Sequence, residues 1–382
     1  MRVAYVIASL IKPSGWRSHA RDFLGALRSQ VEPLLFVAQE EQAEAAQLFP
    51  GLPLYPLPAT QGASLGSREG LARLSAAWSA VRRGSWPAVD LVHSLEAYPT
   101  GLVGLWLARR LGRPHALTAH GTYGVIWHAR RLDRALYAWV LRRTALVCPV
   151  SHGTARLMQA YFGPALQRAR LRPVLNGNNF YLSVPPLAGE RPLPQVPTLL
   201  SVGEVKARKG HHISLEAFAR VQAELPEARY WIAGRYTPGP YFDRLQAIVR
   251  ARGLRNVEFL GPIPGEELSR CYREASLFIL TPQQVGLRFE GFGLVYLEAG
   301  AYHLPVVAAN SGGTADAVAD GETGFLVPEG DAEAAGRAAL RLLTDPELNR
   351  RMGSANRRRA ETLTWERTAC EQVEAYRELL DG

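Results

Sequence analysis

Cysteine is scarce in this sequence of 382 residues, and its three cysteines, Cys148, Cys271 and Cys370, lie far apart along the chain. Their odd number and their isolation predict neither a disulfide framework nor a cysteine-bound metal, and they favour a reducing compartment. Long apolar runs are also missing, because none reaches the roughly 20 residues that a membrane-spanning helix requires. We therefore expect a globular protein of the cytoplasm.

A secretory leader is a further feature that we expect to be absent. Residues 1–10 are apolar, but they carry a single charge and no cleavage pattern. Such a segment is more typical of a buried first strand than of a signal peptide.

Acidic residues are few in the first half of the chain. Residues 1–180 contain 21 Lys and Arg against 9 Asp and Glu, whereas the remainder contains 23 against 26. An imbalance of this kind indicates a partner of opposite charge for the basic half. Nucleic acid, anionic lipid head groups and phosphorylated acceptors all have that charge, and composition alone does not separate them.

The chain is longer than one hydrophobic core usually holds, so two domains are expected. Short apolar runs alternate with amphipathic segments in both halves, which predicts parallel sheets covered by helices on both faces. Prolines interrupt the alternation over residues 181–197 and predict a linker. The expected architecture is therefore two Rossmann-like, doubly wound α/β domains facing each other across a cleft. Their expected bounds are residues 1–180 and 198–363, with a terminal helix over 364–382.

The segment with the clearest chemistry lies between residues 288 and 301. It follows a predicted buried strand, passes two glycines and becomes a helix near Leu294. The first N–H groups of such a helix have no intrahelical partner and suit a diphosphate. Glu290 precedes the helix, and Glu298 lies about one turn inside it, where a carboxylate suits a ribose diol. The residues expected beside the phosphates are Gly291, Phe292, Gly293 and Leu294.

The two glutamates, separated by seven residues, resemble the signature of the retaining glycosyltransferases of the GT-B fold, of the group 1 or family 4 type. The resemblance covers essentially the whole chain and is strongest from residue 201 to residue 327. It implies that Glu298 holds the ribose of a nucleotide-sugar donor and that Glu290 contacts the donor hexose. It also implies that the anomeric configuration is retained, and that neither a protein nucleophile, a metal nor a cofactor is required.

The family pattern extends to a phosphate-binding loop over residues 201–210. Lys209 matches the lysine that contacts phosphate in the family, a point charge on a flexible stem. Glu204 stands where the family usually has an arginine, and a carboxylate repels a diphosphate. Arg208 or Lys206 is therefore expected to supply the missing cation.

Other matches are shorter. His120 follows a predicted strand and corresponds to the family histidine that reaches the transferred sugar. Gly15 is retained where the family has a glycine pair near the phosphates, and Gly312 with Gly313 resembles a second pair that approaches the donor. Gly321 and Gly324, which follow this pair, are expected in turns. The terminal helix resembles the family's crossover helix, which returns to the N-terminal domain and makes Trp365 a packing anchor.

One segment allows two interpretations. Residues 127–143 combine five arginines with three aromatic residues. Such a segment fits a basic amphipathic helix at a membrane surface. It fits better a domain helix whose aromatic residues pack on the sheet and whose arginines face solvent.

We expect, from these observations together, a hexosyltransferase that uses a UDP- or GDP-sugar. Its acceptor would be a hydroxyl of a saccharide, a lipid-linked acceptor or a small molecule, and nucleic acid is not expected as a partner. Contact of the basic domain with the inner membrane face stays open. The alternatives are a sugar-nucleotide epimerase, which would turn over nucleotide sugar without transfer, a phosphorylase, for which no pyridoxal-binding lysine stands out, and a non-catalytic binder of polyanions or membrane surfaces.

Overall fold

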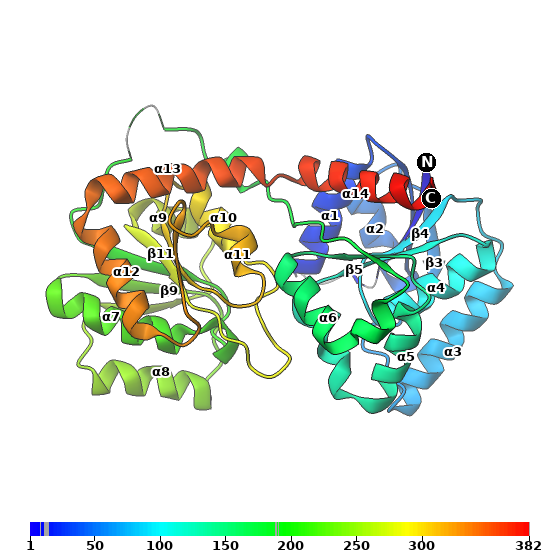
Figure 1. The fold of residues 1–382 in the computed structure, drawn as a ribbon, viewed down its shortest axis with the longest axis horizontal. Helices are drawn as coiled ribbons and strands as arrows, with labels where there is room; N and C mark the ends of the chain where they lie inside the picture. Colours follow the sequence, from blue (N-terminus) through cyan, green and yellow to red (C-terminus); the bar gives the residue numbers. More distant parts are fainter. Residues whose placement is uncertain (8, 11–14, 188, 190, 382) are drawn as a thin grey trace. The chain divides into compact units, whose positions relative to one another are not determined.

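The computed structural model describes residues 1–7, 9–10, 15–187, 189 and 191–381. By its internal contacts the chain forms two compact units (Figure 1). The first comprises Met1–Gly177 and Trp365–Gly382, and the second comprises Asn178–Thr364. The C-terminal segment therefore belongs to the first unit, and residues 181–197 belong to the second.

The first unit is built on a seven-stranded parallel sheet in the order β3-β2-β1-β4-β5-β6-β7. Its strands are β1 (Arg2–Val6), β2 (Glu32–Ala38), β3 (Leu54–Leu57), β4 (Leu91–Ser94), β5 (His115–Ala119), β6 (Leu146–Pro149) and β7 (Arg170–Leu171). Its helices are α1 (Gly15–Leu27), α2 (Gln42–Leu48), α3 (Arg68–Arg83), α4 (Thr100–Leu111), α5 (Arg131–Leu141), α6 (His152–Leu166) and α14 (Trp365–Leu380). Short 3-10 turns are η1 (Gln39–Glu41), η2 (Gly121–Gly124) and η3 (Ile126–Ala129).

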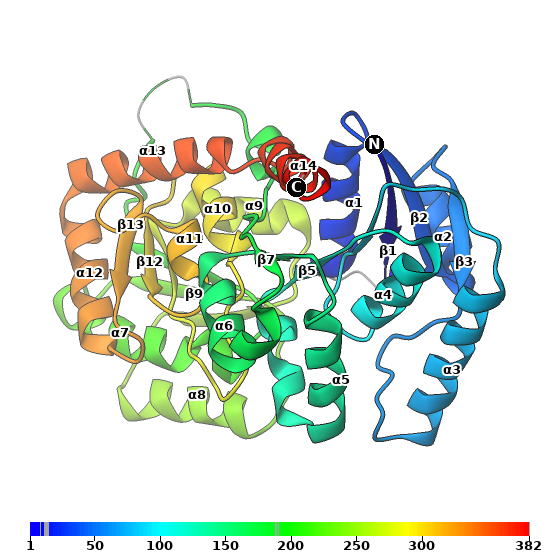
Figure 2. The same cartoon turned by 45° about the vertical axis from the view of Figure 1, so that its right-hand side comes forward.

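Alternate residues of β1 show how this sheet is covered on both faces. Val3 and Tyr5 belong to one apolar cluster, together with residues of α1 and α14. Ala4 and Val6 belong to another cluster, together with residues of α3 and α4. Successive side chains of a strand point to opposite faces, so the two clusters lie on opposite sides of the sheet. Figure 2 shows the helices of this unit around its strands.

The second unit has a six-stranded parallel sheet in the order β10-β9-β8-β11-β12-β13. Its strands are β8 (Thr198–Val202), β9 (Arg229–Ala233), β10 (Val257–Gly261), β11 (Leu277–Leu280), β12 (Val306–Ala309) and β13 (Gly324–Val327). Its helices are α7 (His211–Glu224), α8 (Pro240–Ala251), α9 (Gly265–Glu274), α10 (Leu294–Ala301), α11 (Thr314–Ala317), α12 (Ala332–Thr344) and α13 (Pro346–Thr362), with turns η4 (Phe180–Ser183) and η5 (Ala207–Lys209). Helices α7 and α12 pack together, as do α10 and α13.

Both sheets confirm the expected doubly wound α/β class, because every strand pair is parallel and helices connect the strands. Two local expectations were wrong. Residues 127–143 do not form one helix, because η3 ends at Ala129 and α5 begins at Arg131. Gly324, expected in a turn, begins β13 and pairs with Val306.

The strand order reverses direction at one point in each sheet, between β1 and β4 and between β8 and β11. In open α/β sheets, ligands bind outside the carboxyl ends of the strands at such a point. Within the described residues, no helix combines the length and the hydropathy needed to cross a membrane.

Candidate active site

The reversal point of the second sheet brings together two loops that are distant in sequence. Strands β8 and β11 pair side by side, with Leu199 opposite Leu277, so the loops that follow them leave the same edge. Thr281 Oγ1 donates a hydrogen bond of 2.9 Å to the carbonyl of Gly210. A Cβ atom at Gly210 would clash with the Thr281 main chain, so only glycine allows this approach.

Glu290 lies at this junction and is held by two cations from the other loop. Lys209 Nζ lies 2.5 Å from Glu290 Oε2, and Arg208 Nη1 lies 3.3 Å from the same oxygen. The side chains of Lys209 and Glu290 are each 11% exposed. Burial alone would raise the pKa of Glu290, but Lys209 and Arg208 together hold it below its ordinary value of 4.5. Glu290 is therefore a carboxylate at neutral pH.

The glycine pair expected to approach the donor lies against the main chain of Glu290. Gly313 N donates a hydrogen bond of 2.9 Å to the Glu290 carbonyl. Gly312 has a φ of 59°, and a Cβ atom there would clash with the same carbonyl and with the Phe289 ring. A side chain at residue 312 would therefore displace Glu290.

Helix α10 begins at Leu294, next to Glu290, as the sequence predicts. Among the described residues, the N–H groups of Phe292, Gly293 and Leu294 have no hydrogen-bond acceptor. The Tyr296 hydroxyl donates a hydrogen bond of 3.1 Å to the Leu280 carbonyl and so ties the first turn of α10 to β11. The start of α10 thus combines free N–H donors with a fixed position, which suits an anion.

Glu298 lies on the second turn of α10 and is set apart from these cations. Burial raises the pKa of its carboxyl to about 7, and the phenol of Tyr272, on α9, partly opposes this rise. Among the described residues, the buried Tyr272 hydroxyl has no hydrogen-bond partner. It stacks on Tyr302 with ring centroids 4.9 Å apart. Tyr272 was not foreseen, because nothing in the sequence of α9 distinguishes it from an ordinary core tyrosine.

Helix α13 supports α10 from behind. Asn356 Nδ2 donates to the carbonyls of Tyr296, at 3.2 Å, and of Leu304, at 2.9 Å. Arg357 Nη1 donates to the Ala301 carbonyl at 2.7 Å. These buried amide and guanidinium groups fix the helix that carries Glu298.

We expect Asn356→Ala to lower the free energy of unfolding by about 2–4 kcal/mol, because two carbonyls lose their donor and a small cavity forms. Chemical denaturation followed by circular dichroism would measure the effect. Arg358→Ala, an exposed position on the same helix, is the control and should change stability by less than about 0.5 kcal/mol. Equal stability of the two variants would show that Asn356 does not support α10.

Glu204, which stands where the family usually has an arginine, forms ion pairs of its own. Glu204 pairs with Lys206 at 2.8 Å and with Arg235 at 3.6 Å. Lys206 is therefore engaged with Glu204, whereas Arg208 reaches Glu290. Of the two candidates for the missing cation, the geometry favours Arg208.

In the first unit, His120 follows the carboxyl end of β5. Its Nε2 lies 2.9 Å from the Leu95 carbonyl, and because a carbonyl only accepts, Nε2 carries the proton. Its ring meets His19 edge-on, with centroids 4.4 Å apart. Burial lowers the pKa of His120 to about 4, and the bond to Leu95 partly opposes this. His120 is therefore neutral at pH 7.

Helix α14 packs onto the first unit beside His120. Trp365 is buried and lies edge-on to His19, with ring centroids 5.1 Å apart, so it is a packing anchor. Gly15 begins α1, whereas Lys12, Pro13 and Ser14 lie outside the described residues. His120 and Gly15 belong to the first unit, and the residues around Glu290 belong to the second.

No group of three or more His, Cys, Asp or Glu in the described part of the chain has an arrangement that could hold a metal ion. Positive charge at the Glu290 site instead comes from Lys209, Arg208 and the start of α10.

Comparison with known proteins covers both halves. Residues 13–179 match the family described as Glycosyltransferase Family 4, and residues 190–359 match Glycosyl transferases group 1. A GDP-mannose-dependent alpha-(1-6)-phosphatidylinositol monomannoside mannosyltransferase of Mycolicibacterium smegmatis is 31% identical over 275 residues, which cover 70% of this chain and 71% of the relative. A D-inositol 3-phosphate glycosyltransferase of Streptomyces avermitilis is 29% identical over 368 residues, covering 88% and 77%.

Solved structures agree in fold. Sucrose-phosphate synthase of Thermosynechococcus elongatus superposes with a TM-score of 0.72 at 23% identity, covering 100% of this chain and 99% of that one. Anabaena HepE in complex with UDP gives 0.73 at 18% identity, covering 99% and 100%. At these identities the likeness concerns the fold alone, which is GT-B. The sequence relatives decide the family: this chain belongs to the group 1, family 4 type of glycosyltransferases.

Proposed function

We propose that the protein transfers a hexosyl group from a UDP- or GDP-sugar to an acceptor hydroxyl, with retention of anomeric configuration and without a metal. The observation that carries the proposal is the cluster of Glu290, Lys209 and Arg208 beside the start of α10, at the reversal point of the second sheet. An acid between two cations and a row of free N–H groups supports a donor with a diphosphate and a sugar.

The diphosphate is assigned to the N–H groups of Phe292, Gly293 and Leu294 and to Lys209 and Arg208. A diphosphate competes with Glu290 for these cations, because both ligands are anionic. Donor binding would therefore release the Glu290 carboxylate from Lys209 and leave it to contact the hexose. In the apo protein, Glu290 offsets one of the two positive charges and holds both cationic side chains in place.

The ribose is assigned to Glu298, whose carboxylate is suited to accept two hydrogen bonds from a vicinal diol. The free N–H donors lie at the start of the short helix that carries Glu298, so phosphate and ribose would be placed by one element. Asn356 and Arg357 hold that helix in position.

The positive charges of the proposed site support a transfer in which a diphosphate leaves. As the bond between the anomeric carbon and the phosphate oxygen breaks, positive charge develops on the sugar and negative charge on the leaving diphosphate. Lys209, Arg208 and the start of α10 stabilise the diphosphate. A leaving phosphate oxygen accepts the acceptor proton as the new bond forms on the same face. Neutral His120 is assigned to the transferred sugar.

The acceptor is proposed from charge and from the relatives. Both sequence relatives are named for acceptors that carry phosphate, a phosphatidylinositol mannoside and an inositol 3-phosphate. The basic first 180 residues fit a saccharide, lipid-linked or small-molecule acceptor with such a group. Contact with an anionic membrane face is part of the same proposal.

The test begins with thermal shift on UDP, GDP and ADP and on their sugars. We expect UDP or GDP to raise the melting temperature, and the matching sugar to be hydrolysed slowly and transferred when an acceptor is supplied. Proton NMR of the product should show the donor's α configuration, and activity should persist in EDTA. A β-linked product would exclude retention, and stabilisation by none of the nucleotides would exclude the donor site.

A further inference from the structure

A group of basic residues in the first unit lies at the opposite edge of the sheet from His120. Arg142 and Arg143 connect α5 to β6, and Gln167 and Arg168 connect α6 to β7. Strands β6 and β7 are parallel neighbours, so both connections lie at the amino ends of adjacent strands. His120 follows the carboxyl end of β5, at the opposite edge of the same sheet.

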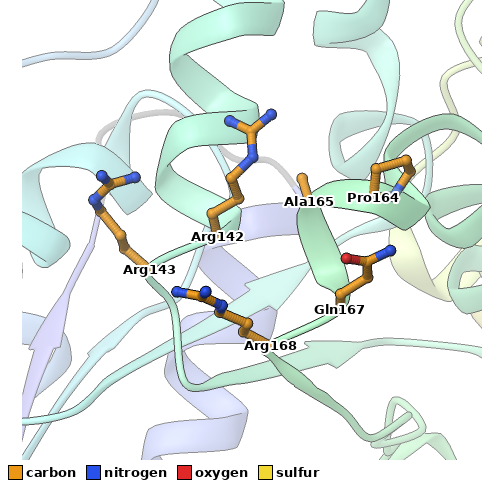
Figure 3. Close-up of a pocket in the computed structure, with 6 residues that line it drawn as sticks. All are labelled: Arg142, Arg143, Pro164, Ala165, Gln167 and Arg168. Atoms are coloured by element: carbon orange, nitrogen blue, oxygen red, sulfur yellow. The ribbon is translucent and has the colours of Figure 1, made fainter.

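A cavity of about 440 Å³ lies between these connections (Figure 3). Its lining comprises three arginines, one glutamine and two apolar residues: Arg142, Arg143, Arg168, Gln167, Pro164 and Ala165. The lining contains N–H donors from four side chains and no carboxylate. We call this space the arginine pocket.

The charges of the arginine pocket lack anionic partners. Within the part of the chain that the structure describes, Arg142 and Arg168 form no ion pair and no side-chain hydrogen bond. Arg143 lies over the Trp139 ring, 4.5 Å from its centroid, and its Nη1 is 3.4 Å from the Trp139 carbonyl. None of these contacts neutralises a guanidinium.

The adjoining strand shows the opposite arrangement. Arg172 pairs with Glu374 at 3.1 Å and also with Glu378, and Arg170 lies 3.6 Å from Glu378. Acidic residues of α14 therefore compensate Arg170 of β7 and Arg172, which follows that strand. Compensation stops at the arginine pocket, which retains its positive charge.

Helix ends offer a simpler reason for arginines at this edge. Cations near a helix C-terminus gain about 0.3–1 kcal/mol from the helix dipole, and α3 and α4 also end in arginine pairs. That effect explains single arginines and arginine pairs at helix ends. It does not explain why arginines from two connections line one cavity without a carboxylate.

We propose that the arginine pocket binds a phosphate-bearing anion, at a site separate from Glu290. Planar guanidinium groups match phosphate oxygens with paired hydrogen bonds, and the cavity is large enough for several phosphoryl groups or a phosphate head group. Free polyphosphate and a lipid head group share this chemistry. The proposal concerns the first unit and does not depend on the donor assigned to the second.

Calorimetric titration with tripolyphosphate at constant ionic strength tests the proposal. We expect a saturable site in addition to the proposed diphosphate site of the second unit, weakened about tenfold or more by Arg142→Ser with Arg168→Ser, because two charge-assisted contacts are lost. The matched control is Arg83→Ser with Arg110→Ser, which removes two exposed helix-terminal arginines outside the pocket. It should weaken binding less than about threefold. Lys209→Ala should retain the site, which separates it from the donor site.

A parallel arm uses co-sedimentation with phosphatidylcholine vesicles that contain phosphatidylglycerol. Binding of vesicles but not of tripolyphosphate, lost only in the Arg142 and Arg168 variant, would identify a lipid head group as the source of phosphate. Equal losses in both double variants would mean diffuse charge attraction and would overturn the proposal. Absence of saturable binding in both arms would also overturn it.

Discussion

Replacing Glu298 by glutamine should stabilise the ligand-free protein at pH 8 and leave its stability nearly unchanged at pH 4.5. Burial raises the pKa of this carboxyl from 4.5 to about 7, so the folded state holds the proton more tightly than the unfolded chain. Below pH 4.5 Glu298 is protonated in both the folded and the unfolded state, so it does not lower the free energy of unfolding. That free energy falls between pH 4.5 and about 7 as the pH rises. A pKa rise from 4.5 to about 7 corresponds to a loss of roughly 3 kcal/mol in the free energy of unfolding at pH 8. The Tyr272 hydroxyl, which lacks a hydrogen-bond partner, is available to the new amide.

Thermal unfolding of wild type and Glu298→Gln at the two pH values would measure this effect. Glu216→Gln is the control, because Glu216 lies on the surface of α7 and pairs with Arg252 at 2.8 Å. Its effect should differ little between the two pH values. A Glu298→Gln variant that is less stable than wild type at pH 8 would mean that the carboxylate stabilises the apo protein.

The same substitution should weaken binding of the nucleotide about tenfold or more at pH 8, because a charge-assisted contact to the ribose is lost. Only the ionised form of Glu298 is assigned to this contact. With a pKa of about 7, its ionised fraction rises about tenfold between pH 6 and pH 8. Wild-type affinity should therefore rise relative to that of Glu298→Gln over this range. Parallel pH profiles for both proteins would remove Glu298 from the ribose site.

Glu290→Gln should reduce transfer about 10²–10³-fold, because a carboxylate assigned to the reacting sugar is lost. Nucleotide affinity should be unchanged or slightly higher, since Lys209 and Arg208 no longer have a competing anion. The ligand-free protein should lose roughly 3 kcal/mol of stability, because two neighbouring cations, one of them 11% exposed, are left without their acid. Steady-state kinetics, calorimetry and thermal unfolding separate the three effects.

Glu204→Gln is the matched control, because it removes another acid of the second unit whose partners, Lys206 and Arg235, are more exposed. Such a surface pair contributes less than about 1 kcal/mol, and transfer should continue. Wild-type transfer by Glu290→Gln would refute its role at the sugar. A large loss of nucleotide affinity would place Glu290 at the phosphates instead.

The local part of the site could be predicted from the sequence. A buried strand, two glycines and an apolar helix follow one another within the 25 residues from Leu277 to Ala301, and short-range pattern determines such a junction. The start of α10 at Leu294 agrees with that prediction. Alternating apolar and amphipathic segments likewise predicted two parallel sheets, because periodicity and order fix the fold class.

What the sequence could not provide was contact across long separations. Lys209 and Glu290 are 81 residues apart, and their ion pair depends on the adjacency of β8 and β11, which is a property of strand order. The closeness of Gly312 to the Glu290 carbonyl likewise depends on the position of β12 beside β11 in the sheet. The residue pattern did not predict the break between η3 and α5 at Arg130, because apolar and basic residues continue through it.

The ion pairs of Glu290 with Lys209 and Arg208 affect how donor binding would depend on salt. In an open basic site, an incoming diphosphate displaces counterions from solvent, and its affinity falls steeply as salt is added. Here the displaced anion is a tethered carboxylate, whose local concentration bulk salt does not change. Donor binding would therefore exchange one anion for another within the protein, and affinity would fall less steeply with added salt than at an open basic site.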